Sequence, residues 1–138
     1  MKLKNQVCNL ELAQKLKSLG VKQKSIFHWH DDGSTDKPYI SFEYRGSVDS
    51  IWCSAFTVAE LGEMLPEREE TDYRVSFINI HKNKTSNGNG TWTVKFVWRT
   101  LENQHAANDA KYITYDNNLA DALAKMLVRL LENHLITL

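Results

Sequence analysis

The segment from Leu119 to Leu131 constrains the fold of this chain more than any other part of its sequence. Apolar side chains recur there at intervals of three and four residues over about four helical turns. They are Leu119, Ala122, Leu123, Met126, Leu127, Leu130 and Leu131. This spacing places them on one face of an α-helix, and Asn117 or Asn118 can cap its first turn. The pattern therefore predicts an amphipathic helix that covers a sheet.

Two further helices have clear end signals. Asn9 can cap a helix that begins at the next residue, and Gly20 is placed to end it in a left-handed conformation. Thr57 and Glu60 have the spacing of a capping box, in which each side chain binds the other residue's backbone N–H. Pro66 ends this second helix. We therefore expect helices over about 10–19 and 58–65.

The remaining segments alternate between apolar and polar residues, as β-strands do. The expected strands cover residues 25–30, 39–44, 51–53, 73–81, 91–100 and 111–115. Strands that follow one another in pairs favour antiparallel hairpins over parallel βαβ units. The sequence thus predicts an α+β fold, with an antiparallel sheet of about five or six strands packed with three helices. At 138 residues, one domain over 1–138 is expected.

Charge and hydropathy exclude several classes of protein. The chain has 17 basic and 17 acidic residues, and this neutral balance makes nucleic acid an unlikely partner. Residues 1–24 hold six lysines against one glutamate, whereas residues 60–72 hold six acidic residues against one arginine. These segments form either two solvated faces or a polarised surface for a partner or a second copy. No apolar run is long enough for a membrane helix, and no leader peptide is expected.

The two cysteines, Cys8 and Cys53, form neither a disulfide framework nor a CxxC metal motif. Their number and spacing indicate a reducing, cytoplasmic environment, in which both thiols act as small apolar side chains. A catalytic thiol needs a neighbour that lowers its pKa, and Cys53 has no base within several residues in sequence.

The segment that most resembles a metal site contains His28 and His30. Residues two apart in a strand project to the same side, which would place the two imidazoles about 7 Å apart. A third ligand would have to come from Asp31, Asp32, Glu43 or His81. The alternative is that both histidines are structural or face solvent, since nothing in the sequence fixes the third ligand.

Other chemical motifs are weaker still. The sequence has no GxSxG, GxGxxG or GxxxxGK[ST] motif, and the glycine-rich segment 87–90 joins two expected strands. The acidic residues of 60–72 fit a capping box and a solvated patch better than a general acid. The tryptophans and tyrosines fit a core, a protein interface or, beside Lys95 and Arg99, base stacking. We therefore predict no catalytic residue, no cofactor-binding residue and no cofactor.

Three blocks of the sequence resemble small uncharacterised proteins of bacteriophages, prophages and their bacterial hosts. They are NLELAQKLKSLGVKQK (9–24), SAFTVAELGEMLP (54–66) and ADALAKMLVRLLENHL (120–135). The strands and the alanine- and leucine-rich helix are also similar, more loosely, to the phage α-β-α sandwich domain. The resemblance implies an origin in a mobile element and a cytoplasmic setting. It implies no site residues.

Together these features favour a non-enzymatic protein-interaction module that binds an unidentified protein or a second copy of itself. The alternative is a small metal-binding protein or enzyme that uses His28 and His30. Nucleic-acid binding through the lysine-rich N-terminal segment is a third possibility, which the neutral net charge disfavours.

Overall fold

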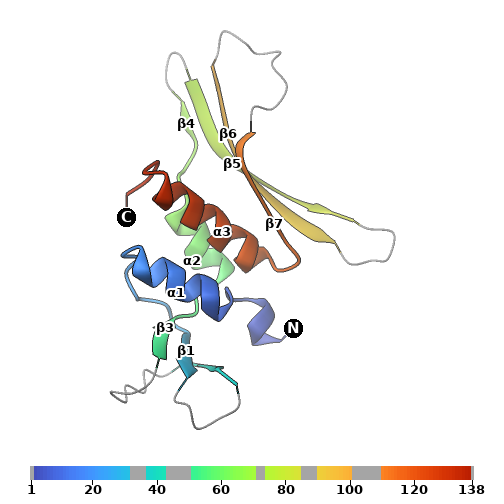
Figure 1. Cartoon of the computed structure of the whole chain (residues 1–138). Helices are drawn as coiled ribbons and strands as arrows, with labels where there is room; N and C mark the ends of the chain where they lie inside the picture. The colour runs from blue at the N-terminus through green and yellow to red at the C-terminus, as the bar shows by residue number, and fades with distance from the viewer. Residues whose placement is uncertain are drawn as a thin grey trace.

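Figure 1 shows a computed structural model of the chain, which describes residues 2–31, 37–42, 51–70, 74–84, 90–100 and 110–137. These residues form three α-helices, a short 3-10 helix and seven strands. In chain order the elements are η1 (Leu3–Asn5), α1 (Leu10–Ser18), β1 (His28–Asp31), β2 (Tyr39–Ser41), β3 (Ile51–Ser54), α2 (Val58–Met64), β4 (Glu69–Glu70), β5 (Arg74–Asn83), β6 (Thr91–Thr100), β7 (Ala110–Asp116) and α3 (Leu119–Glu132).

The strands form two antiparallel sheets. The smaller sheet has the order β2-β1-β3, and the larger has the order β4-β5-β6-β7. The expected α+β fold with three helices is confirmed, but the strands are divided between two sheets where the sequence suggested one. Alternation of apolar and polar residues specifies the faces of a strand and not its neighbours, which is why the pattern did not show this division.

The helices lie between the two sheets (Figure 1). α3 packs against β6 and β7 of the larger sheet, and α1 packs against β3 of the smaller one. α1 and α2 both contact α3. Among the described residues, no helix combines the length and hydropathy needed to cross a bilayer. The helical layer therefore joins the two sheets, and α3 lies at its centre.

α3 supplies the largest share of the core. The predicted residues Ala122, Leu123, Met126, Leu127 and Leu130 are fully buried or nearly so. Further residues of α3 are also buried, and these are Ala120, Asp121, Ala124 and Val128. The buried face is wider than the seven-residue pattern predicts, because a sheet covers one side of α3 and two helices cover the other. The alanines are small enough to let these elements approach closely.

The predicted helix ends are confirmed. The side chain of Asn9 caps α1, and Asn118, one of the two expected candidates, caps α3. Thr57 and Glu60 form the reciprocal capping box of α2. Gly20 has a φ of 86°, the left-handed conformation expected after the end of α1. Local sequence therefore determines where all three helices begin.

Polar contacts fasten the N-terminal segment to elements far away in the sequence. The backbone N–H of Asn9 donates to Asp121 Oδ1 at 2.7 Å, and Asn118 Nδ2 donates to the carbonyl of Val7 at 3.2 Å. The indole N–H of Trp29 donates to the carbonyl of Cys8 at 2.9 Å. These bonds hold residues 7–9 between α3 and the smaller sheet.

Some expectations differ from the structure or lie outside its described residues. The acidic segment 67–72 is expected from its charge to be a surface loop, but Glu69 and Glu70 form the short strand β4, which pairs with Val75 and Ser76. The sequence also predicts a turn at the Asp-Gly pair 32–33, a break at 45–47 and a polar connection over 101–110. The first two, most of the third and most of the glycine-rich segment 87–90 lie outside the described residues.

Both cysteine thiols should resist labelling in the folded protein. Cys8 and Cys53 are free and fully buried. Burial raises the pKa of the Cys8 thiol to about 12 and that of Cys53 to about 11. At pH 7.5 we expect 5,5′-dithiobis(2-nitrobenzoate) to label neither thiol quickly, and to label both after denaturation in guanidinium. Rapid labelling of the native protein would contradict this packing.

Candidate functional site

A pocket of about 810 Å³ opens where four separate parts of the chain meet. Its walls come from η1, the first residues of α2, the β5–β6 hairpin and the junction between β7 and α3. Val58, Ala59, Trp92 and Leu119 contribute apolar surface, and Lys82 contributes an ammonium group. Pockets of this size that combine apolar walls with a few polar groups are the usual form of a binding site.

The helix caps and the strand register position the walls of this pocket. The capping residues Thr57 and Asn118 place the N-terminal ends of α2 and α3 at its rim. Lys82 and Trp92 are paired across the β5–β6 hairpin, and Lys82 Nζ lies 5.3 Å from the centroid of the Trp92 ring. This contact holds a cation over an aromatic wall of the pocket.

The acidic group of the pocket is already engaged by its neighbours. Asp116 Oδ2 accepts from Lys125 Nζ at 2.6 Å, and Asp116 Oδ1 accepts from the backbone N–H of Asn118 at 2.9 Å. Burial alone would raise the pKa of Asp116, but these hydrogen bonds outweigh it and lower that pKa. Its charge is thus balanced by Lys125. Asp121 is a second carboxylate in the first turn of α3, so acidic groups already occupy the N-terminal end of that helix. Lys82 is therefore the group of the pocket that favours an acidic ligand.

His28 and His30 lie in β1, the central strand of the smaller sheet, and each stacks on an aromatic ring. The His28 ring lies 5.2 Å from the Trp52 ring, and the His30 ring lies 5.4 Å from the Tyr39 ring. His30 is only 1% exposed. Nδ1 of His28 is buried and has no hydrogen-bond partner among the residues that the structure describes. Burial lowers the pKa of His28, and the nearby His30 lowers it further.

Of the four candidate third ligands, one is placed by the structure. His81 lies in β5 of the larger sheet, near Asn79. Asp32, Glu43 and the side chain of Asp31 lie outside what the structure describes. Within its described residues, no three histidine, cysteine, aspartate or glutamate side chains are close enough together to hold a metal ion. Metal binding at the histidine pair stays a prediction.

The acidic residues around α2 have the structural roles that the sequence suggested. Glu60 Oε2 accepts from the backbone N–H of Thr57 at 2.7 Å and from Ser25 Oγ at 3.0 Å. Its Oε1 accepts from the backbone N–H of Ile26 at 3.3 Å. The other glutamates of this region, Glu63, Glu67, Glu69 and Glu70, are exposed. Glu60 therefore connects the capping box to the segment that leads into β1.

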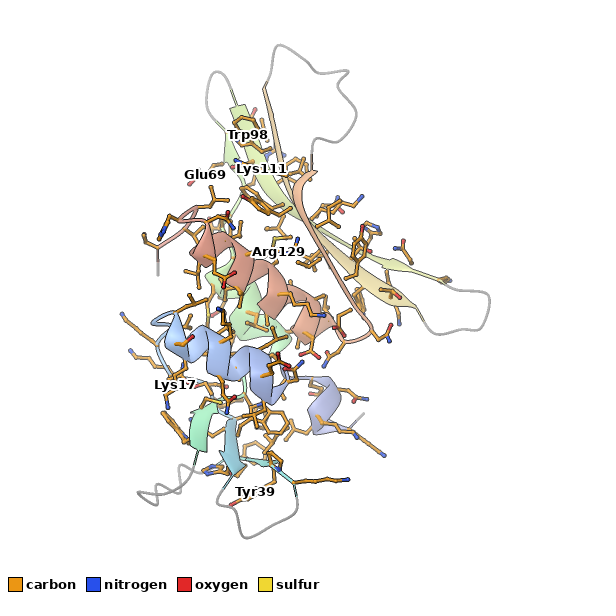
Figure 2. All side chains as sticks on the ribbon, in the orientation of Figure 1. Lys17, Tyr39, Glu69, Trp98, Lys111 and Arg129 are labelled. Carbon is orange, nitrogen blue, oxygen red and sulfur yellow. The ribbon has the colours of Figure 1, made fainter. Side chains whose placement is uncertain are left out.

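Sequence reasoning missed the lysines that lie over tryptophan rings. Lys17 of α1 lies over Trp52 of the smaller sheet, as Lys82 lies over Trp92. Lys111 lies 5.7 Å from the centroid of Trp98, and Figure 2 shows this pair at the end of the larger sheet that extends beyond α3. The hairpin register could have identified Lys82 with Trp92, but the Lys17 contact depends on the packing of α1.

No protein-family model, no curated protein and no solved structure matches the chain.

Proposed function

We propose that this protein is a non-enzymatic protein-interaction module of the phage or prophage type, and that its pocket binds a segment of a partner protein. The observation that carries the proposal is the pocket of about 810 Å³, with an apolar wall, a lysine and the N-terminal end of α3. The partner segment presents an apolar side chain next to an acidic one.

The chemistry of the pocket supports this choice of ligand. Apolar atoms of Val58, Ala59 and Trp92 offer surface for an apolar side chain. Lys82 favours a negative charge beside it. The neutral net charge of the chain favours a protein partner over a nucleic acid. The phage origin and the cytoplasmic setting are supported by the three sequence blocks and by the cysteine content.

Filling the pocket should abolish the interaction while leaving the fold intact. Ala59 is exposed in the first turn of α2, so Ala59→Arg adds a long side chain to the pocket wall without disturbing the core. Gln14→Arg makes the same charge change on an exposed position of α1 and is the matched control. Proteins that co-purify with the wild type are identified and quantified by mass spectrometry. Each is then purified and tested for direct binding.

For a partner confirmed in this way, we expect Ala59→Arg to weaken binding by at least about 10-fold, because the added side chain occupies the space of the partner's apolar side chain and this loss exceeds the attraction between the added charge and the acidic group. Lys82→Glu should weaken it as well, because it reverses the charge that meets the acidic group. Gln14→Arg should bind like the wild type. Equal binding by all of these variants would refute the pocket as the contact surface.

A second candidate function rests on the buried Nδ1 of His28, for which the described part of the chain provides no hydrogen-bond partner. A metal ion would satisfy it, with His30 as a second ligand. Metal analysis of the purified protein and of a His28→Ala/His30→Ala variant tests this function. Stoichiometric metal that disappears in the variant would favour the metal-binding function. Absence of metal from the wild type, together with unchanged binding to the partner by the variant, would reject it.

A further inference from the structure

One edge of the larger sheet is covered by side chains of α3. The carbonyl of Ile113 in β7 accepts from Arg129 Nη1 at 2.9 Å, and the carbonyl of Tyr115 accepts from Lys125 Nζ at 3.3 Å. Figure 2 shows Arg129 on the side of α3 that faces β7. Two long basic side chains thus occupy carbonyls that a further strand would need. Covering of this kind is a common protection against edge-to-edge pairing.

The other edge of the larger sheet has much less protection. β4 pairs only with Val75 and Ser76 of β5. From Ile78 to Asn83, the described pairing of β5 is with β6 alone. The helix α3 packs on β6 and β7, and both strands lie on the opposite side of β5 from this edge. We call Ile78–Asn83 the open edge.

The backbone groups that the open edge presents follow from the alternation of antiparallel pairing. The carbonyls of Ile113 and Tyr115 in β7 bind side chains of α3 and therefore point away from β6. In β6, Lys95 lies opposite Ile113 and Thr93 lies opposite Tyr115. The backbone N–H and C=O groups of Lys95 and Thr93 therefore point toward β5. The residues of β5 opposite these two are Asn79 and His81, which bond to β6. The residues of the open edge that point their backbone groups outward are therefore Ile78, Ile80 and Lys82.

An exposed apolar side chain lies at the centre of the open edge. Ile80 is 45% exposed, although it lies on the same side of β5 as Ile78, which packs against the main core. A second strand beside β5 would cover it. A long edge with an exposed apolar centre is the kind of surface that recruits another strand.

We propose that the open edge pairs with the same edge of a second copy of the chain, antiparallel and about a two-fold axis at Ile80. Ile80 of one copy then faces Ile80 of the other, and Ile78 faces Lys82. Each of these pairs exchanges both backbone hydrogen bonds, because all of these residues point outward. The two larger sheets become one continuous sheet, which is an isologous interface.

The charges around the open edge are complementary in this arrangement. Lys82 and Lys84 lie at one end of the edge, and Glu69 of β4 lies at the other, beside Glu70, whose carboxylate forms an ion pair with Arg68 at 2.7 Å. Antiparallel pairing brings the lysine end of each copy to the glutamate end of the other. The chain as a whole has no net charge, so the two copies experience no overall repulsion. Lys82 belongs to both surfaces: its backbone groups lie on the open edge, and its side chain lines the pocket.

Intermolecular disulfide formation gives a direct test. Antiparallel residues that exchange both hydrogen bonds have Cα atoms about 5.5 Å apart, which is within disulfide range. Cys8 and Cys53 are buried, so Ile80→Cys introduces one accessible thiol. We expect mild oxidation to convert Ile80→Cys into a covalent dimer on non-reducing gels. Tyr115→Cys, at an exposed position of the protected edge, should form no covalent dimer and run at the mass of one chain on the same gels.

Sedimentation equilibrium completes the test with the full chain. The wild type should show twice the chain mass of 15.9 kDa, and Ile80→Lys should raise the dimer dissociation constant at least about 10-fold. Lys84→Glu should weaken the dimer, and Glu69→Lys combined with it should restore binding. Circular dichroism verifies that each variant is folded. A monomeric wild type, or a dimer that Ile80→Lys leaves unchanged, would overturn the proposal.

Discussion

A Leu127→Ala substitution is expected to lower the free energy of unfolding by about 3 kcal/mol, within the range of buried leucine truncations. Leu127 has no exposed surface and belongs to the main core cluster, which includes residues of all three helices. The substitution removes apolar contacts and leaves a cavity in the helix that lies between the two sheets. Because elements surround α3 on both sides, they have little freedom to collapse into the space.

Urea denaturation followed by far-ultraviolet circular dichroism measures this loss. Leu135→Ala is the matched control, because Leu135 follows α3 in the chain and is 40% exposed. That control should lose less than about 1 kcal/mol, since it leaves no enclosed cavity. Equal losses for the two variants would mean that α3 does not lie between the sheets as described.

A Glu60→Ala substitution should destabilise the protein by about 2 kcal/mol, more than the loss of a helix cap alone, which costs about 1 kcal/mol. The Glu60 carboxylate accepts from the backbone N–H groups of Thr57 and Ile26 and from the Ser25 hydroxyl. The Ser25 side chain is buried. Removing the carboxylate therefore takes the acceptor from two backbone N–H groups at once, that of Thr57 in the cap of α2 and that of Ile26 before β1, whereas the Ser25 hydroxyl keeps the carbonyl of Ala55 as an acceptor.

Thermal denaturation of Glu60→Ala, Glu60→Gln and Glu63→Ala measures how much the hydrogen bonds of the Glu60 carboxylate contribute to stability. Glu63 lies on the same helix and is exposed, so Glu63→Ala should change stability by less than about 0.5 kcal/mol. Glu60→Gln keeps one acceptor oxygen, so its stability should lie between those of Glu60→Ala and Glu63→Ala. If Glu60→Ala is no less stable than Glu63→Ala, the proposed link between α2 and β1 does not contribute to stability.

The parts of the fold that the sequence predicts are those that depend on neighbours in the chain. Asn9, Asn118 and the Thr57–Glu60 box act within one helical turn, so their residue types and spacing are enough to place the helix ends. The long β5–β6 hairpin is also local, and both of its strands were expected within a few residues of their observed bounds.

The division into two sheets depends on contacts between distant segments and was not predicted. β1 takes β2 and β3 as neighbours on its two sides, so the smaller sheet is complete before α2 begins. Nothing in the alternation of β1 indicates that it avoids β5. The extra buried alanines of α3 are the one sequence signal of a helix that is covered on both sides.

The candidate sites, too, depend on contacts between distant segments that the sequence does not reveal. The spacing of His28 and His30 correctly places both imidazoles on one side of a strand, but their aromatic neighbours come from β2 and β3. The pocket could not be predicted, because η1, α2, the β5–β6 hairpin and the start of α3 meet there only after folding. Lys82 opposite Trp92 is the single part of it that a hairpin register reveals.

Hydrogen–deuterium exchange of the full chain, alone and bound to its purified partner, tests most directly that the protein acts through the pocket. The account predicts slower exchange on binding at residues 57–60 and 117–121, where the two helix N-termini form the rim. Slower exchange confined to β1 and β3, around the histidine pair, with no change at either helix N-terminus, would contradict it.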